Sequence, residues 1–246
     1  MMPGAVIIGA GPGIGQAVAR RFAREGLPIT LIARSERTLR AAADAVASHG
    51  VPIVTLQADS TDRAELDAAL DQAIGEHGVP DVAVYNAALV RADGLGELSV
   101  RDHMEAWAVN VVGALNAAAH LAPAMATRGS GSFLVTGGMP EPKPQYVSLS
   151  LGKAGVRTLV ALLDQQYRSS GVHVASVTVD GPVASGTDFD PDHIAEHYWN
   201  LHTQPRHLWD SEALHTGRAD AERLPGAHDG PSRSRPEDAG PYLNTA

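Results

Sequence analysis

Three glycines crowd into the short segment that follows the first apolar run of the chain, Ala5–Gly9, which itself ends in a glycine. Glycine permits a tight turn and lets the backbone approach a pyrophosphate closely. The helix predicted at Gly13–Glu25 would direct free N–H groups and its positive end toward the phosphate charge. This succession of strand, turn and helix predicts a nucleotide-binding loop. Its residues are Gly9, Gly11, Gly13, Ile14 and Gly15.

A second feature, the pair Arg34 and Ser35, bears on which nucleotide binds. The pair follows the strand predicted at Ile29–Ala33. A carboxylate at this point binds the ribose 2′-hydroxyl of NAD, whereas a 2′-phosphate needs cationic and hydroxyl donors. Ala33 stands at the carboxylate position, so the pair predicts NADP(H) as the cofactor. Ser35 is also suited to cap the following helix, and the two roles are compatible.

Strands and helices that could position these residues alternate along the chain. The predicted strands are Ala5–Gly9, Ile29–Ala33, Ile53–Ala58, Val82–Asn86, Ser132–Thr136 and Val172–Val179. The predicted helices are Gly13–Glu25, Glu36–Ser48, Arg63–Glu76, about Val100–Thr127 and about Ser148–Ser170. Short links between such elements require parallel pairing through right-handed crossovers. The predicted fold class is α/β, a Rossmann-type doubly wound parallel sheet in a single domain.

Length and composition set the domain boundaries. A chain of 246 residues, 44% hydrophobic and 19% charged, can bury a core of ordinary size. Residues 218–246 hold four prolines, three glycines and almost no large apolar side chain, a composition that does not build a core. We therefore predict a nucleotide-binding domain over residues 1–217, followed by a tail.

Several classes of function are disfavoured by the same numbers. The absence of cysteine excludes a disulfide scaffold, a thiol nucleophile and a Cys-ligated metal. A net charge of −9 without long charge runs argues against nucleic-acid or anionic-membrane partners. We find no apolar stretch near the roughly 18 residues of a membrane helix, and no basic start typical of a signal peptide. A cytoplasmic protein with a small-molecule substrate is expected.

Four later segments extend the pattern of the glycine loop. They are Asp59-Ser60, Asn86-Ala87-Ala88, Asn110 within Val109–Gly113, and Lys153 within Ser150–Ala154. With the spacing Gly9-xxx-Gly13-x-Gly15, they resemble the short-chain dehydrogenase/reductase family from about residue 4 to 217. The Asn86 segment resembles the family's NNAG segment, with Tyr85 and Ala88 departing from it. Lys153 sits like the lysine of the YxxxK motif.

This resemblance implies roles for individual residues. Asp59 and Ser60 would lie beside the adenine, and Asn86 and Ala87 would line the cofactor site. Asn110 and Lys153 would belong to the catalytic set, with Lys153 also holding the nicotinamide ribose. The segment after the sixth strand is similar to the family's PG-x-V-x-T segment, which meets the nicotinamide carboxamide. Its matching residues are Gly181, Val183 and Thr187, while Asp180 replaces the family's proline.

The active-site pattern breaks at two positions. Leu149 stands where the family has its tyrosine acid, and Gly138, or Thr136 if the register slips by two, stands at the family's serine. Three interpretations remain open. Tyr146 could supply the proton if the helix starts early enough to align it with Lys153. The substrate could need no acid, as for an iminium or a conjugated alkene. The protein could instead bind NADP(H) without redox turnover.

The ring-rich segment 184–210 is predicted to be a substrate lid. An amphipathic helix that buries Ile194, Tyr198 and Leu201 is the alternative. Within the segment, the residues from His193 to His197 match the H-x-x-E-H metalloprotease pattern. Short patterns recur by chance among many histidines, so no metal is predicted.

The two long helices, Val100–Thr127 and Ser148–Ser170, have alanine-rich faces. The family resemblance implies a homodimer or homotetramer formed through them.

Overall fold

The computed structural model describes residues 3–217, and the predicted tail lies outside these described residues. The strands are β1 (Ala5–Ile8), β2 (Ile29–Ala33), β3 (Ile53–Gln57), β4 (Val82–Tyr85), β5 (Gly131–Thr136), β6 (Val172–Val179) and β7 (Glu212–His215). The α-helices are α1 (Ile14–Arg24), α2 (Glu36–Val46), α3 (Arg63–His77), α4 (Val100–Trp107), α5 (Gly113–Arg128), α6 (Val147–Tyr167) and α7 (Pro191–Thr203). The shorter turns are η1 (Ala47–His49), the π-helical η2 (Ala108–Val112), η3 (Arg168–Ser170) and η4 (Arg206–Leu208).

All seven strands form one parallel sheet in the order β3-β2-β1-β4-β5-β6-β7. The predicted Rossmann-type fold is confirmed, and all six predicted strands are present within one residue of their predicted ends. β7 was not predicted. Only four residues long, with Glu212 and His215 at its ends, it lacks the apolar run that identifies the inner strands.

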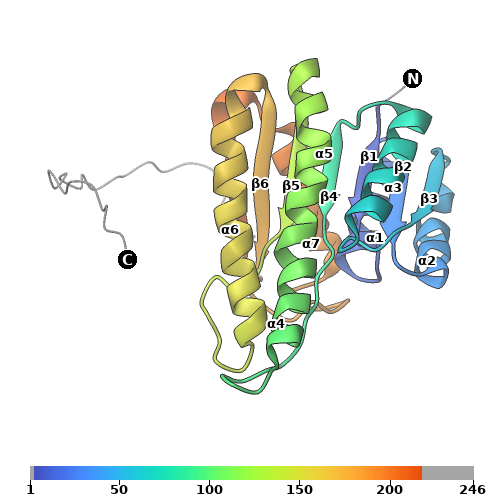
Figure 1. Ribbon diagram of the computed structural model, residues 1–246. Coiled ribbons are helices and arrows are strands. Elements are labelled where there is room, and N and C mark those ends of the chain that lie inside the picture. Colours follow the sequence, from blue (N-terminus) through green and yellow to red (C-terminus); the bar gives the residue numbers. More distant parts are fainter. Residues whose placement is uncertain (1–2, 218–246) are drawn as a thin grey trace, which may run out of the picture.

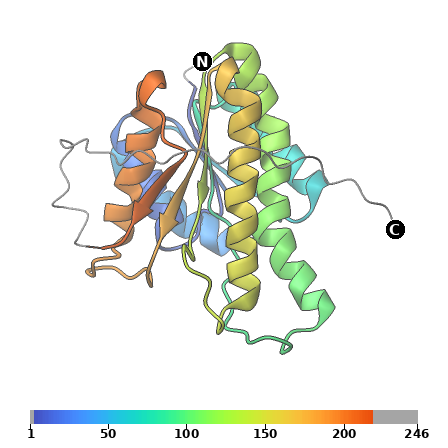
Figure 2. The ribbon, with the colours of Figure 1, turned by 90° about the vertical axis from the view of Figure 1, so that its left-hand side faces the viewer.

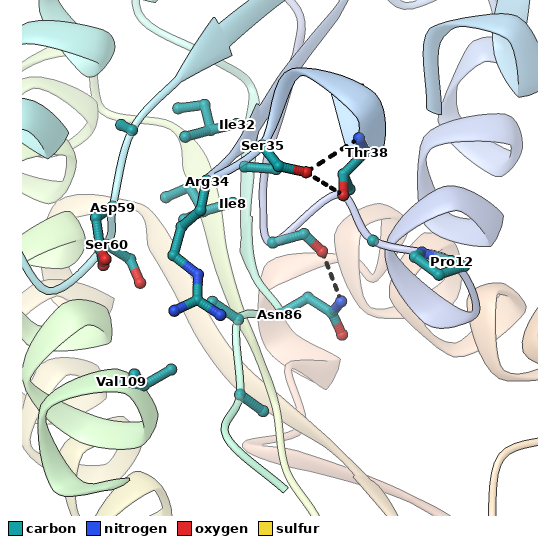
Figure 3. A pocket seen from close by; sticks show the side chains of 16 residues that line it. Ile8, Pro12, Ile32, Arg34, Ser35, Thr38, Asp59, Ser60, Asn86 and Val109 are labelled. Atoms are coloured by element: carbon teal, nitrogen blue, oxygen red, sulfur yellow. Dashed lines mark hydrogen bonds between the residues drawn. The ribbon is translucent and has the colours of Figure 1, made fainter. Parts of the chain in front are cut away.

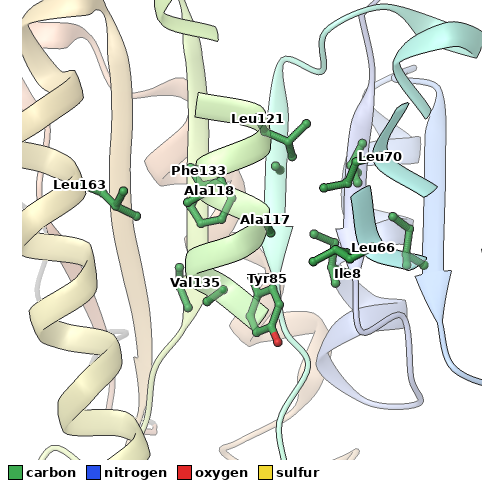
Figure 4. Packing of buried hydrophobic residues seen from close by; sticks show 14 of the residues in the cluster. Ile8, Leu66, Leu70, Tyr85, Ala117, Ala118, Leu121, Phe133, Val135 and Leu163 are labelled. Carbon is green, nitrogen blue, oxygen red and sulfur yellow. The ribbon is translucent and has the colours of Figure 1, made fainter. Parts of the chain in front are cut away.

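Helices cover both faces of the sheet. Figures 1 and 2 show α3, α5 and α6 on one face and α1, α2 and α7 on the other. Each face buries its own hydrophobic cluster. In the first cluster, Leu121 of α5 and Leu70 of α3 are fully buried, with Phe133 of β5 beneath the helices (Figure 4). This layering leaves the carboxyl ends of the strands free to carry a site.

Elements α4, η2 and α5 run on as one helix from Val100 to Arg128, which is long and apolar enough to cross a membrane by length and composition alone. The sequence expectation that no stretch approaches this length was therefore wrong. The helix is a core element, because 56% of its apolar window is buried inside the protein. Ala114, Ala117 and Leu121 are fully buried against the sheet, so packing inside the domain accounts for their apolar character.

Candidate functional site

A cavity of about 410 Å³ opens at the carboxyl edge of the sheet, where the chain leaves β1 with β2 on one side and β4 on the other (Figure 3). Doubly wound sheets bind ligands at this point, because the connections from the two neighbouring strands diverge there. Its lining residues are Ile8, Gly9, Gly11, Pro12, Ile32, Ala33, Arg34, Ser35, Thr38, Ala58, Asp59, Ser60, Asn86, Ala87, Ala88 and Val109. The structure thus brings together most of the predicted cofactor-binding residues.

Two glycines of the loop are required by close backbone packing. A Cβ on Gly9 would overlap the backbone nitrogen of Ala87, and one on Gly15 would overlap the carbonyl oxygen of Gly9. Gly9 also has a φ of 88°, which favours glycine. Gly11 has open space around it and lines the cavity. Gly13, Ile14 and Gly15 lie outside the cavity lining, at the start of α1.

The end of β2 forms the polar side of the cavity. Arg34 extends into it between Ser60 and Asn86 (Figure 3). The Ser35 hydroxyl accepts a hydrogen bond from the Thr38 backbone N–H at 3.2 Å, which confirms Ser35 as the N-cap of α2. The Thr38 hydroxyl lies 2.8 Å from that of Ser35, and both residues line the same cavity as Arg34. Thr38 was missed by sequence reasoning, although its position three residues after the N-cap brings it to the same edge.

A chain of hydrogen bonds links the glycine loop to the far side of the sheet. Asn86 Nδ2 donates to the Gly9 carbonyl at 2.8 Å, and the Thr136 hydroxyl donates to Asn86 Oδ1 at 2.8 Å. The hydroxyl of Thr136 has one proton, and this bond uses it. The Tyr198 hydroxyl, 2.6 Å away, must therefore be the donor to Thr136. Tyr198 lies fully buried in α7, and burial raises its pKa. Nothing in the sequence signals this contact.

Lys153 is buried beside this series of hydrogen bonds. Its Nζ donates to the Thr136 carbonyl at 2.6 Å, and only 6% of the residue is exposed. Burial in apolar surroundings disfavours the ammonium form and lowers the pKa of Lys153 to about 8. The lysine thus lies where β5 ends, one strand away from β4 and the cavity.

Asn110 lies in the π-helical turn η2, which interrupts the helix above the end of β4. Its side-chain amide pairs with the backbone of Leu89: Nδ2 donates to the carbonyl and Oδ1 accepts from the N–H, both at 3.2 Å. Single π-helical turns are frequent at functional sites. Here the turn allows Asn110 to hold the connection that follows Asn86–Ala88.

The hydroxyls around the missing acid have other partners. Leu149 is buried and offers no proton. Ser148 Oγ donates to Asp93 Oδ1 at 2.8 Å. Ser150 Oγ accepts from the backbone N–H of Lys143 at 3.1 Å. Both serines therefore secure the first turn of α6.

Tyr146 lies just outside α6, as its N-cap residue. The helix begins at Val147, so the condition that would align Tyr146 with Lys153 on one helical face is not met. Its backbone instead pairs with that of Asp93, which accepts from the N–H of Val147 at 3.1 Å. Among residues 3–217 the Tyr146 hydroxyl has no hydrogen-bond partner.

The connection from β6 to α7 holds the predicted nicotinamide residues. Thr187 Oγ1 donates to the Ala184 carbonyl at 2.7 Å, and Val183 is 40% exposed. A Cβ on Gly181 would overlap the Phe189 ring, so this glycine lets the ring fold over the connection. Gly181, Val183 and Thr187 do not line the cavity at the end of β1.

The predicted lid, residues 184–210, contains a packed helix. Residues 191–203 form α7, which packs against α1 and buries Ile194, Tyr198 and Leu201. The amphipathic-helix alternative is correct for residues 191–203, and the lid stays a prediction for residues 184–190 and 204–210. In the H-x-x-E-H segment, Glu196 binds Arg21 and Arg24 of α1 at 2.7 Å each. Helix packing accounts for this carboxylate.

The fold and the site together define a class. Residues 4–191 match the model of the short chain dehydrogenase family, and the protein belongs to this family of nicotinamide-dependent oxidoreductases. An uncharacterized oxidoreductase of Staphylococcus epidermidis is 26% identical over 215 residues, covering 83% of this chain and 92% of that protein. A similar oxidoreductase of Staphylococcus saprophyticus is 28% identical over 220 residues, with the same coverage.

Solved structures of this family have the same architecture. An alcohol dehydrogenase from the archaeon Thermococcus sibiricus, complexed with 5-hydroxy-NADP, superposes with a TM-score of 0.79 at 25% identity. That match covers 87% of this chain and 96% of the other. A metagenomic short-chain oxidoreductase in complex with NADP also gives 0.79, at 26% identity, over 86% and 96% of the two chains.

Proposed function

We propose that the protein is an NADP(H)-dependent oxidoreductase that acts on a small organic carbonyl, imine or enone. The observation that carries the cofactor assignment is Arg34, which extends into a cavity that Ser35 and Thr38 also line. A cation and two hydroxyls that line one cavity suit a 2′-phosphate, whereas no carboxylate stands at Ala33 to favour NAD. The NADP complexes of two related structures support the same choice.

Each part of the site has a role in this proposal. The cofactor, when bound, supplies or accepts hydride. The open backbone at Gly11 and the start of α1 face its pyrophosphate, and Asp59 and Ser60 flank the adenine. Lys153 holds the nicotinamide ribose, and Asn110 fixes the connection that follows Ala88. The connection carrying Gly181, Val183 and Thr187 meets the carboxamide.

A fluorescence titration with NADPH and NADH tests the cofactor proposal. Charge-assisted hydrogen bonds contribute about 1.5–3 kcal/mol, so Arg34→Ala should weaken NADPH binding about 10- to 100-fold and leave NADH binding nearly unchanged. Arg37→Ala is the matched control, because Arg37 is exposed on α2 and lies outside the cavity lining. Equal loss of affinity for both nucleotides would remove Arg34 from 2′-phosphate recognition.

A second candidate function, cofactor binding without redox turnover, is favoured by Leu149 and Gly138 at the family's acid and serine positions. General acid catalysis commonly contributes about 10² to 10⁴ in rate. The NADPH complex should therefore be mixed with a panel of ketones, iminium ions and enones. Oxidation by any member supports the reductase, and tight binding with no oxidation across the panel supports the second function.

Assembly through the long helices is a further part of the proposal. Exposed apolar side chains occur on α4, α5 and α6, and they are Met104, Trp107, Leu115, Leu151 and Leu162. Apolar patches of this kind mark interfaces between subunits. We propose a homodimer or homotetramer, tested by light scattering on the intact protein and on Leu162→Glu. A monomeric intact protein would contradict it.

A further inference from the structure

Tyr85 is the last residue of β4, the strand beside the cavity, and its side chain is buried. The hydroxyl donates to the Val109 carbonyl at 2.6 Å and to Ser60 Oγ at 3.2 Å. Burial raises the pKa of Tyr85 to about 12, so the hydroxyl keeps its proton at neutral pH. Tyr85 therefore links two separate segments of the chain as a hydrogen-bond donor.

Both partners of the Tyr85 hydroxyl line the cavity at the end of β1, whereas Tyr85 itself does not. Ser60 belongs to the connection from β3 to α3, and Val109 belongs to the π-helical turn η2. These two segments are far apart in the sequence and form neighbouring parts of the cavity wall. Tyr85 holds them together from behind that wall.

The proposed binding mode assigns this part of the cavity to the adenine base. Arg34 would bind the 2′-phosphate, and the glycine loop would face the pyrophosphate. Both groups are attached to the ribose of the adenosine half, so the base extends from this ribose away from the glycine loop. Figure 3 shows Ser60 and Val109 on the side of Arg34 opposite to Pro12 of the loop. The base therefore belongs between Arg34 and the wall that Tyr85 supports.

The surroundings of the Tyr85 hydroxyl are closely packed. A Cβ on Gly113, at the start of α5, would overlap the hydroxyl and would lie 2.9 Å from the Ser60 carbonyl. The hydroxyl thus lies between Ser60, Val109 and the backbone of α5. Removing or displacing it should shift the two cavity walls, because each loses a fixed contact. Tyrosine at this position is a departure from the family's asparagine, so the contact is a feature of this chain.

We propose that Tyr85 is a positioning residue for the adenine base of the cofactor. It keeps Ser60 and Val109 at the separation that the base requires, without contacting the base itself. The inference rests on the proposed NADP(H) function and names a residue that sets the affinity for its adenosine half.

Other parts of the cofactor site have supports of their own. The Gly9 carbonyl is held by Asn86, and Lys153 Nζ is held by the Thr136 carbonyl. Neither hydrogen bond uses the Tyr85 hydroxyl. Loss of this hydroxyl should therefore weaken the contacts to the base and leave those to the pyrophosphate and the nicotinamide ribose in place.

The test is Tyr85→Phe, with binding of NADPH and NADH measured by fluorescence and that of adenosine 2′,5′-bisphosphate by displacement of NADPH. All three ligands contain adenine, but the bisphosphate lacks the nicotinamide half and NADH lacks the 2′-phosphate. Loss of a buried hydrogen-bond donor typically changes affinity by about tenfold. Tyr85→Phe should weaken all three ligands by this same factor, whereas Arg34→Ala should spare NADH.

Tyr167→Phe is the matched control. Tyr167 ends α6, packs against the same hydrophobic cluster as Tyr85 and lies outside the cavity lining. This variant should leave all three affinities unchanged. If Tyr85→Phe does not fold, Gly113→Ala provides the second variant, because it displaces the hydroxyl while the tyrosine remains. Circular dichroism verifies that each variant is folded, and Gly113→Ala should show the same uniform loss.

The pattern of losses distinguishes the possible outcomes. A greater loss for NADPH than for the bisphosphate would indicate a general disturbance of the site and would overturn the proposal. A loss that spares NADH would also overturn it, since Tyr85 would then act through the 2′-phosphate. Unchanged affinities in Tyr85→Phe would refute the positioning role and leave the proposed function intact. An unaltered protein that binds none of the three ligands would refute both.

Discussion

Tyr85 and Gly113 form a contact whose energetics can be tested directly. Tyr85, which stands where the family has asparagine, donates to the Val109 carbonyl at 2.6 Å and to Ser60 Oγ at 3.2 Å. Figure 4 shows its hydroxyl pointing out of the core at the end of β4. A Cβ on Gly113 would overlap that hydroxyl and would lie 2.9 Å from the Ser60 carbonyl. Glycine at 113 is therefore required by Tyr85.

Gly113→Ala should destabilise the protein by up to about 2 kcal/mol. Overpacking typically costs about 1–3 kcal/mol, occasionally more. Against this, replacing a helical glycine by alanine contributes about 1 kcal/mol of stabilisation. Tyr85→Phe alone should cost about 1–3 kcal/mol, because it leaves the Val109 carbonyl unpaired. In the double variant the overlap with the hydroxyl is gone, so its cost should be smaller than the sum by at least about 1 kcal/mol.

Equilibrium unfolding in urea measures each free energy, provided that the slope with denaturant stays constant. Gly75→Ala is the control, because Gly75 lies in α3 with nothing within 4 Å of its added Cβ. This variant should be stabilised by about 1 kcal/mol. A Gly113→Ala protein as stable as Gly75→Ala, or strict additivity with Tyr85→Phe, would refute the reasoning.

The other predictions concern Thr136 and Lys153. Thr136→Val should lower stability by about 1–3 kcal/mol and weaken NADPH binding, because Asn86 and Tyr198 lose their shared partner. Thr136→Ser should restore both stability and binding. A Thr136→Ser protein as unstable as Thr136→Val would contradict the proposed series of hydrogen bonds. The pKa of Lys153 is lower in the folded protein, about 8, than its ordinary 10.5, so the unfolded chain binds the extra proton between these values and stability should rise with pH there. Lys153→Met should remove this rise and increase the free energy of unfolding by about 3 kcal/mol below pH 8. Unfolding curves of both proteins at pH 7 and pH 10 measure this difference, and an equal rise with pH in Lys153→Met would contradict the prediction.

The strands next to the cavity could be predicted because each is an apolar run that ends at a glycine or a polar residue. Ile29–Ala33 and Val172–Val179 were predicted to the residue. α7 was harder to assign, since its aromatic and histidine side chains suit either a pocket or a packed helix. Its place against α1 depends on Arg21 and Phe22, which contact Glu196 and Trp199 across a long sequence separation.

Local sequence likewise could not predict how the site is held together. The bond from Tyr198 to Thr136 joins α7 to β5, and the one from Asn86 to Gly9 joins β4 to β1. Such pairings depend on the tertiary structure, so a single sequence gives no periodicity that reveals them. The glycine loop was predictable because its strand, turn and helix are contiguous.

The position of β1 between β2 and β4 has a consequence for synthesis of the chain. A growing chain that ends before Val82 can pair β1 with β2 and β2 with β3, but one edge of β1 remains without its neighbour. Asn86, which binds the Gly9 carbonyl, is added later still. A ligand stabilises only a state that can bind it. The cofactor therefore cannot assist the first three strands to fold, and its stabilising effect on the nascent protein begins only once β4 has joined the sheet.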